Sequence, residues 1–208
     1  MDMKSNFWLC AGSRQYIYNH FTGKSFQLVP GIQDNIVSIT QAEGNKYYLA
    51  SEHRLYEAQL VNEQLSSIKA IKLEDVYLID YIYYNKPSKQ LVVNTLLDKL
   101  FIYDTQNQQI SNTGNTMRDI GINKIIPSKK EKNVLLIATD GDGVYKLDLN
   151  RKTLVHFLQE DTRRPNKMNG SIVKDIYMDN ANRIWNVIYP TGITIYTEKY
   201  PAYEWFMH

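Results

Sequence analysis

The stretch Ser171 to Tyr196, SIVKDIYMDNANRIWNVIYPTGITIY, decides the fold of this chain. It holds three short apolar runs, separated by the turn-forming segments Asp179-Asn180-Ala181-Asn182 and Pro190-Thr191-Gly192. Short runs of β-branched and aromatic residues bounded by such turns are typical of antiparallel strands. The stretch therefore predicts a meander of three strands, at Ile172–Met178, Ile184–Ile188 and Ile193–Tyr196.

The same pattern occurs four more times upstream. The copies align on the centre of the second strand and on the turn that follows it. The aligned central residues differ in number by 40, 44, 44 and 49, and they are Trp8, Tyr48, Val92, Leu136 and Trp185. A period of roughly 40 to 50 residues with four strands per unit is the signature of a β-propeller blade. We therefore predict an all-β chain of about five blades, each of four antiparallel strands.

The other strands complete this pattern. First strands are predicted at Ile36–Thr40, Val76–Tyr83, Ile120–Ile126 and Ile172–Met178, and the first copy has none because Trp8 comes too soon. Fourth strands are predicted at Ser25–Val29, Ser67–Lys72, Gln109–Ser111, Thr153–Leu158 and Tyr203–Phe206. The whole chain, 1–208, is then one propeller segment, with blades at approximately 5–30, 35–73, 75–112, 118–159 and 170–207.

The unit resembles the two-component regulator propeller repeat. That family has a first strand Val-x-x-Ile-x-x-Asp, then Leu-Trp-Ile-Gly-Thr, then Gly-Leu-x-x-Tyr. The matching residues of the last copy are Val173, Ile176, Asp179, Ile184, Trp185, Gly192, Ile193 and Tyr196. Leu135–Thr139 and Gly143-Val144 match in the copy before it. The resemblance spans nearly the whole chain and is sharp from about Val134 onward, whereas the Tyr48 and Val92 copies depart from the Trp and Gly of the motif.

Propellers of this family form the periplasmic sensor region of hybrid two-component regulators. The resemblance therefore implies a sensor segment that recognises a carbohydrate breakdown product and signals to a histidine kinase outside this chain. It implies a periplasmic location as part of an inner-membrane protein, with the export signal and the membrane helix outside this chain. The missing first strand of the first copy further predicts an open slice of a larger propeller, whose partners are the neighbouring blades, and the segment itself is expected not to be an enzyme.

Composition is ordinary for a soluble globular protein, with 43% hydrophobic and 22% charged residues among 208. The net charge of +2 is too small to predict electrostatic attraction to nucleic acid or to a membrane surface. No apolar run approaches the roughly 20 residues that span a bilayer. The single cysteine, Cys10, excludes an internal disulfide and is expected to be an inert strand residue.

Catalytic chemistry has little support in this sequence, and no catalytic residue, cofactor or metal is expected. The four histidines lie in different repeats without a triad motif, which favours surface or turn positions. A propeller glycosidase would need two facing carboxylates, for which Asp80, Asp119 and Asp179 are candidates, but no motif selects a pair. The segment Asp140-Gly141-Asp142-Gly143 is similar to a calcium loop, yet the twelfth residue is Arg151 rather than Glu, which favours a hairpin turn.

Ligands and partners of propellers usually meet the loops of one face, because loops vary while the strands are fixed. The turns between second and third strands supply the candidates Arg14, His53, Asp98, Asp140, Asp142 and Tyr189. The long loop Gln159–Gly170 adds Arg163 and Arg164, which could grip a carboxylate or sulfate. An oligosaccharide is the expected ligand. The alternative is a protein-interaction scaffold without a small ligand, which would present a flat face rather than a pocket.

The aromatic residues Trp8, Tyr48 and Trp185 are expected between blades. Replacing Trp185 by alanine should then cost about 3 to 5 kcal/mol of stability. An open slice would also expose two apolar end faces, so the chain is expected to be an open arc or to pair end to end with a second copy as a homodimer.

Overall fold

A computed structural model describes residues 6–11, 14–27, 32, 34–62, 64–74, 76–97, 99–116, 119–160 and 168–197 of the chain. Every regular element in these ranges is a β-strand. Among them, no helix is long and apolar enough to cross a membrane. The chain divides into two compact units, Met1–Asn112 with Thr116–Asp119, and Thr113–Asn115 with Ile120–His208.

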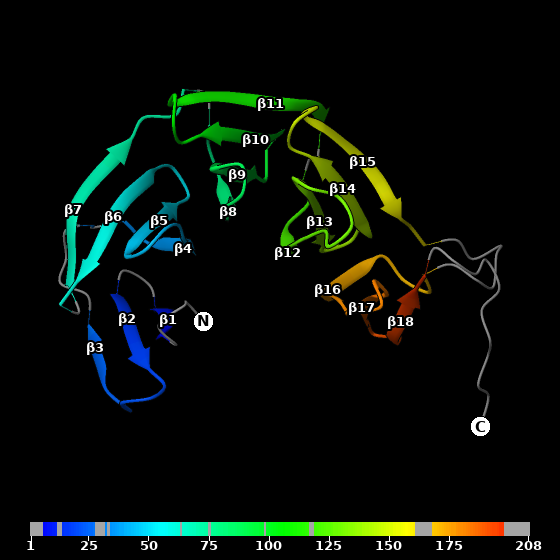
Figure 1. Cartoon of the computed structure of the whole chain (residues 1–208), viewed down its shortest axis with the longest axis horizontal. Coiled ribbons are helices and arrows are strands. Elements are labelled where there is room, and N and C mark those ends of the chain that lie inside the picture. The colour runs from blue at the N-terminus through cyan, green and yellow to red at the C-terminus, as the bar shows by residue number, and fades with distance from the viewer. Residues whose placement is uncertain are drawn as a thin grey trace. The chain divides into compact units, whose positions relative to one another are not determined.

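The first unit holds three antiparallel sheets, in which strands consecutive in the chain pair with each other (Figure 1). The first sheet consists of β1 (Asn6–Ala11), β2 (Arg14–Asn19) and β3 (Ser25–Gln27). The second sheet consists of β4 (Ile36–Gln41), β5 (Lys46–Ser51), β6 (Leu55–Val61) and β7 (Gln64–Ile71). The third sheet consists of β8 (Ile79–Asn85), β9 (Gln90–Thr95), β10 (Lys99–Asp104) and β11 (Gln109–Thr116).

The second unit holds two more sheets of the same kind. The fourth sheet consists of β12 (Ile122–Pro127), β13 (Val134–Thr139), β14 (Val144–Asp148) and β15 (Thr153–Leu158). The fifth sheet consists of β16 (Ile172–Met178), β17 (Ile184–Tyr189) and β18 (Gly192–Tyr196). The five sheets confirm the predicted blades. The predicted strand Tyr203–Phe206 lies outside the described residues.

Some predicted strand limits were wrong. The strand predicted from Val76 begins at Ile79, because Leu78 has a φ of 52° that interrupts the extended backbone. The strand β12 begins at Ile122 rather than at Ile120. The fourth strand of the third sheet, β11, extends to Thr116, well beyond the predicted end at Ser111.

The first strands of four sheets share a β-bulge at the same place. In the second sheet Ile36 pairs with Ser51 and Ser38 with Ala50, which leaves Val37 outside the ladder. The equivalent unpaired residues of the third, fourth and fifth sheets are Asp80, Asn123 and Lys174. Such an extra residue bends the strand and re-aims its own side chain.

This common bulge fixes which residues are equivalent from sheet to sheet. The pair that follows it is Ser38 with Ala50 in the second sheet and Asp175 with Val187 in the fifth. In each of the four sheets, the residue two positions before the second-strand member of this pair is the aligned central residue. These residues are Tyr48, Val92, Leu136 and Trp185. The sequence alignment of these central residues is therefore confirmed in register.

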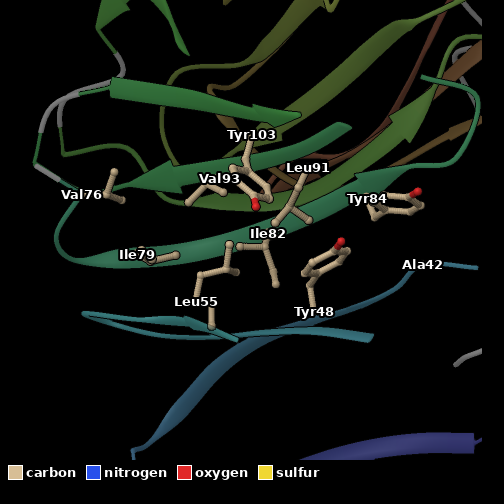
Figure 2. Packing of buried hydrophobic residues seen from close by; sticks show 11 residues of the cluster. Ala42, Tyr48, Leu55, Val76, Ile79, Ile82, Tyr84, Leu91, Val93 and Tyr103 are labelled. Atoms are coloured by element: carbon tan, nitrogen blue, oxygen red, sulfur yellow. The ribbon is translucent and has the colours of Figure 1, made fainter. Parts of the chain in front are cut away.

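Within each unit, the central residues Trp8, Tyr48 and Leu136 face the next sheet along the chain. Between the second and third sheets, Tyr48 and Leu55 point toward Ile82 and Leu91, as Figure 2 shows. Trp8 of the first sheet contacts Tyr47 of the second, with ring centroids 4.8 Å apart. Packing is therefore directional, and each inter-sheet core combines the forward face of one blade with the rear face of the next.

The second unit repeats this arrangement. Leu136, Ala138 and Val144 of the fourth sheet form a buried cluster with Val173 and Ile176 of the fifth. Polar groups close the same interface, since Asn123 Nδ2 donates a hydrogen bond to the Val173 carbonyl at 3.0 Å. In the first unit, the Ser38 and Thr40 hydroxyls accept hydrogen bonds from backbone N–H groups of the edge strand β8, at 3.0 and 3.1 Å. An edge strand thus finds partners on the neighbouring blade.

Candidate functional site

One end of the strands gathers the candidate residues of the second unit. In a meander, the turn between second and third strands lies at the same end as the connection from the fourth strand to the next sheet. We call this the loop end. In the second unit it carries the turn 140–143 and the start of β16, which are joined by a hydrogen bond from Gly143 N to the Ser171 carbonyl at 2.8 Å.

The turn 140–143 is a closed hairpin. The Thr139 hydroxyl donates to the Gly143 carbonyl at 2.8 Å and accepts from Asp142 N at 3.1 Å. Gly143 has a φ of 74°, and a Cβ there would lie 2.3 Å from the Leu158 carbonyl oxygen, so only glycine fits. The predicted hairpin is confirmed. Among the described residues no group of three or more His, Cys, Asp or Glu side chains could hold a metal ion.

Asp140 forms an ion pair across the two sheets of this unit. Its Oδ1 lies 2.7 Å from Lys174 Nζ, and both side chains are about half exposed. The hydrogen bond from Lys174 is the main reason why the pKa of the Asp140 carboxyl is lower than usual. Lys174 is the bulge residue of β16. The bulge therefore directs a cation to the loop end, where it meets the turn.

Asp142 belongs to a second polar group, with Tyr145 and His156. The Tyr145 hydroxyl donates to Asp142 Oδ2 and lies 2.8 Å from His156 Nε2, which is 3.4 Å from the same carboxylate oxygen. Since the hydroxyl proton points to Asp142, the oxygen can accept from Nε2–H. Burial raises the pKa of Tyr145, and the bond to Asp142 raises it further. This group can bind hydroxyls or a cation with its exposed carboxylate edge.

The second sheet carries a comparable group at its own loop end. Asp34 accepts hydrogen bonds from the Tyr56 hydroxyl at 2.6 Å and the Ser51 hydroxyl at 3.1 Å. Arg54 lies 3.7 Å from the same carboxylate. The bond from Tyr56 is the main cause that lowers the pKa of Asp34. Tyr56 and Tyr145 occupy the same register position, so a Tyr–Asp pair at the loop end occurs in both units.

Three other predicted site residues, His53, Tyr189 and Arg14, lie in or next to turns of their own sheets. His53 is an exposed turn residue, 4.0 Å from Glu52. Tyr189 is exposed at the turn of the fifth sheet. Arg14 is the first residue of β2. Asp98, Arg163 and Arg164 lie outside the described residues.

Sequence reasoning missed Lys174, Asn123, Tyr145 and His156 as members of the loop end. His156 was expected at the surface or in a turn; it is an exposed residue of β15, and its ring contacts that of Tyr145 with centroids 4.0 Å apart. A signal for the bulge residues exists in the sequence. Each is the first variable residue of an Ile/Val-x-x-Ile pattern, which occurs at Ile36–Ile39, Ile79–Ile82, Ile122–Ile125 and Val173–Ile176.

Two of the three glycosidase candidates, Asp179 and Asp80, have structural roles. Asp179 accepts hydrogen bonds from Ala181 N, Arg183 N and Trp185 Nε1, at 2.8, 2.9 and 3.0 Å. Asp80 Oδ1 accepts from Asn94 Nδ2 at 2.7 Å. Asp179 therefore stabilises a turn, and Asp80 is hydrogen-bonded to the Asn94 side chain of its own sheet.

A small crevice lies at the other end of the strands, between the fourth and fifth sheets, with a volume of about 20 Å³. Its walls include the ion pair Lys146–Glu131, at 2.5 Å, and the edge-to-face rings of Phe157 and Tyr196, 5.2 Å apart. Glu131 is paired with Lys146, and the Ser128 hydroxyl accepts hydrogen bonds from Lys130 N and Glu131 N.

Asp179 makes the stability of this chain pH-dependent. Its pKa is far below the usual value, first because Trp185 Nε1 donates to it and then because backbone and side-chain groups of Arg183 do. A carboxyl whose pKa is lower in the folded than in the unfolded chain stabilises the fold at pH values above its unfolded pKa of about 4. This stabilisation is lost as the pH falls toward the pKa of the folded state.

We expect Asp179→Asn to lower the urea midpoint at pH 7 and to make the midpoint fall less steeply below about pH 4. The control is Asp175→Asn on the adjacent strand, and identical pH profiles for Asp179→Asn and the wild type would contradict this.

The fold defines a chain of β-propeller blades. No family model matches the sequence, and no curated protein matches it. Solved structures do match. One is the extracellular domain described as part of the hybrid two-component system BT4673 from B. thetaiotaomicron, with 21% identity and a TM-score of 0.71 over 92% of this chain. Another is the corresponding domain of BT3049 from the same organism, with 21% identity and a TM-score of 0.65 over 92% of this chain.

These matches establish the fold of the chain. The chain spans about a quarter of the length of these domains, 26% and 25% respectively. Both of those proteins are described as extracellular parts of two-component systems.

Proposed function

We propose that this chain is a blade segment of the extracytoplasmic sensor region of a hybrid two-component system. It would lie in the periplasm, contribute no catalysis, and pass a binding event to a kinase outside this chain. The observation that carries the proposal is the likeness of 92% of the chain, at a TM-score of 0.71, to an extracellular domain of such a system. The resemblance of the last copy to two-component regulator repeats supports it independently.

We further propose that the loop end of the fourth and fifth sheets contributes to binding a carbohydrate breakdown product. Asp140, Lys174 and Asp142 place two carboxylates and an ammonium group at one partly exposed rim. Such charged groups form strong hydrogen bonds with sugar hydroxyls, and Lys174 can also pair with the carboxylate of an acidic sugar. His156 and Tyr145 hold Asp142 in place.

The test is calorimetric titration of the chain with a panel of neutral and uronic-acid-containing oligosaccharides. We expect at least one to bind, and the double variant Asp140→Asn/Asp142→Asn to weaken binding by about tenfold or more, since hydrogen bonds to charged groups contribute about 1.5–3 kcal/mol. The matched control is Asp148→Asn, which removes a carboxylate at the opposite end of β14. Equal loss of affinity in both variants would contradict the assignment of the loop end.

The alternative function is a protein-interaction scaffold without a small ligand. It would be favoured if no oligosaccharide of the panel bound to a chain whose far-ultraviolet circular dichroism is that of folded β-sheet.

A further inference from the structure

The second unit separates its charges between the two ends of its strands. The end opposite the loop end, which we call the turn end, carries the turns 128–133, 149–152 and 179–183. Among the described residues it holds seven basic and three acidic side chains, a net charge of +4, namely Lys129, Lys130, Lys132, Lys146, Arg151, Lys152 and Arg183 with Glu131, Asp148 and Asp179. The net charge of +2 of the whole chain therefore hides a basic surface.

The loop end of the same unit has the opposite sign. Its described charged side chains are Asp140, Asp142, Glu160 and Lys174, which sum to −2. Lys124 and Asp175, on neighbouring first strands, cancel each other in an ion pair at 2.5 Å. The unit is thus polarised along its strands, so that a polyanion is attracted to the turn end and repelled by the loop end.

The three carboxylates of the turn end are engaged in local structure. Asp148 accepts hydrogen bonds from Asn150 N at 2.9 Å and from Arg151 N at 3.0 Å. Asp179 accepts bonds from its own turn, and Glu131 is paired with Lys146. These acidic groups are therefore held in place by the turns that they stabilise.

Both arginines of the turn end lie against groups of their own turns. Arg183 Nε donates to Asp179 Oδ2 at 2.6 Å, and Arg151 Nε lies 3.8 Å from Asp148 Oδ2. The Arg183 guanidinium also lies 5.6 Å from the ring centroid of Trp185. Trp185, which was expected between blades, is thus half-buried and contacts a turn of its own sheet. The cations that this end presents to a partner are mainly lysines.

The lysines of the turns are exposed, namely Lys129, Lys130, Lys132 and Lys152. Lys129 is also positioned by the fifth sheet. Its Nζ donates to Asn180 Oδ1 at 3.1 Å and lies 5.6 Å from the ring centroid of Tyr177. An amide and an aromatic ring hold this ammonium group without neutralising its charge.

The shape of the turn end and its type of cation select the partner. The crevice there has a volume of about 20 Å³, which is room for about one water molecule rather than for a sugar ring. Specific recognition of a carboxylate or sulfate on a small ligand favours the planar fork of arginine, whereas lysine is a flexible point charge. Exposed lysines on tight turns around so small a crevice fit a dense and evenly spread negative charge, as on an anionic phospholipid surface.

We propose that the turn end of the second unit binds electrostatically to the anionic phospholipid headgroups of a membrane surface. The inference rests on the proposed function only for the presence of a membrane beside the sensor region, and the binding itself is a property of the chain alone. The contact is superficial and sensitive to salt, because it acts through screened charges. It leaves the loop end, with Asp140 and Asp142, on the side away from the membrane, where a soluble oligosaccharide can reach it.

The test is co-sedimentation of the whole chain with vesicles of phosphatidylcholine and phosphatidylglycerol, and with vesicles of phosphatidylcholine alone. We expect binding only to the anionic vesicles at about 50 mM salt, and its loss at about 0.5 M salt. A lysine near an anionic surface contributes about fivefold to partitioning, so Lys129→Gln/Lys132→Gln should weaken binding about 30-fold. The matched control is Lys69→Gln/Lys72→Gln, which removes two exposed lysines of the first unit and should bind like the wild type.

Other results overturn the proposal. Equal weakening by the two double variants would show that net charge, rather than the turn end, drives binding. A chain that does not sediment with anionic vesicles, or that binds phosphatidylcholine equally well, has no electrostatic membrane contact. Release of the bound chain by polygalacturonate would show that an acidic polysaccharide is the preferred polyanion. If Lys129→Gln/Lys132→Gln fails to fold by circular dichroism, Lys132→Gln/Lys152→Gln tests the same end.

Titration with the oligosaccharide panel separates this inference from the proposed function. Lys129→Gln/Lys132→Gln should bind oligosaccharide like the wild type, because its substitutions lie at the opposite end of the strands. A chain that binds oligosaccharide but not anionic vesicles would overturn the membrane contact alone. A chain that binds anionic vesicles but no oligosaccharide would overturn the loop-end site and leave the membrane contact standing.

Discussion

Replacing Tyr48 with alanine is expected to lower the free energy of unfolding by about 3 to 5 kcal/mol, the cost of deleting a large buried aromatic side chain. Tyr48 is 1% exposed between the second and third sheets, with its ring 5.7 Å from that of Tyr84. Its hydroxyl lies 3.3 Å from Glu57 Oε2, and burial raises the pKa of Tyr48 to about 12. The truncation would leave a cavity in the middle of an inter-sheet core.

Urea denaturation followed by tryptophan fluorescence would measure this loss. The matched control is Trp185→Ala at the equivalent position of the fifth sheet, where we expect a cost of only about 1 kcal/mol in the isolated chain, typical of a partly exposed site. Tyr48→Phe separates the hydroxyl from the ring. Equal costs for Tyr48→Ala and Trp185→Ala would show that Trp185 is as fully covered as Tyr48.

Asn186→Leu is expected to raise the free energy of unfolding by about 1 to 3 kcal/mol. Asn186 is 0% exposed, and its Oδ1 has no hydrogen-bond partner; the same holds for Oγ1 of its cross-strand neighbour Thr194. The equivalent residues of the second and third sheets are Leu49 and Val93. A buried polar atom without a partner carries its full desolvation cost, which leucine removes at nearly the same shape.

The mirror experiment is Leu49→Asn, which should cost more than about 3 kcal/mol, because it loses apolar contacts and buries an unpaired amide. The urea midpoints of both variants give the comparison. A decrease in stability for Asn186→Leu would mean that an ordered water or a polar ligand satisfies Asn186 and Thr194. The intended explanation would then be wrong.

The second and third strands of each blade could be predicted from the sequence because their signal is local. A run such as Val134–Thr139, followed by Asp and Gly residues, carries strand propensity and turn chemistry within a dozen residues. The period then fixed which copies are equivalent. The first strand of the third sheet was less predictable, because Val76 is apolar and buried without being in a strand. Apolar character reports burial, and only φ and ψ separate strand from loop.

The candidate site was only partly predictable. The turn residues Asp140 and Asp142 follow from hairpin chemistry, but their partners come from other strands. Lys174 reaches Asp140 because of a bulge, and His156 reaches Asp142 because β15 pairs with β14. The Val-x-x-Ile pattern locates the bulge residue Lys174, but the partner of each contact lies on a different strand and cannot be read from a local pattern. The exposure of Trp185 also depends on a neighbouring surface rather than on its own sequence.

The shared bulge has a consequence for how such blades can diversify. Its extra residue takes no part in the ladder, so it can be exchanged without changing strand register or the buried pattern of the sheet. In this chain the four positions hold Val37, Asp80, Asn123 and Lys174, which are apolar, acidic, amide and basic. Each of these four sheets thus has one position outside its ladder, where relatives with the same fold can differ in side-chain chemistry without a change of strand register.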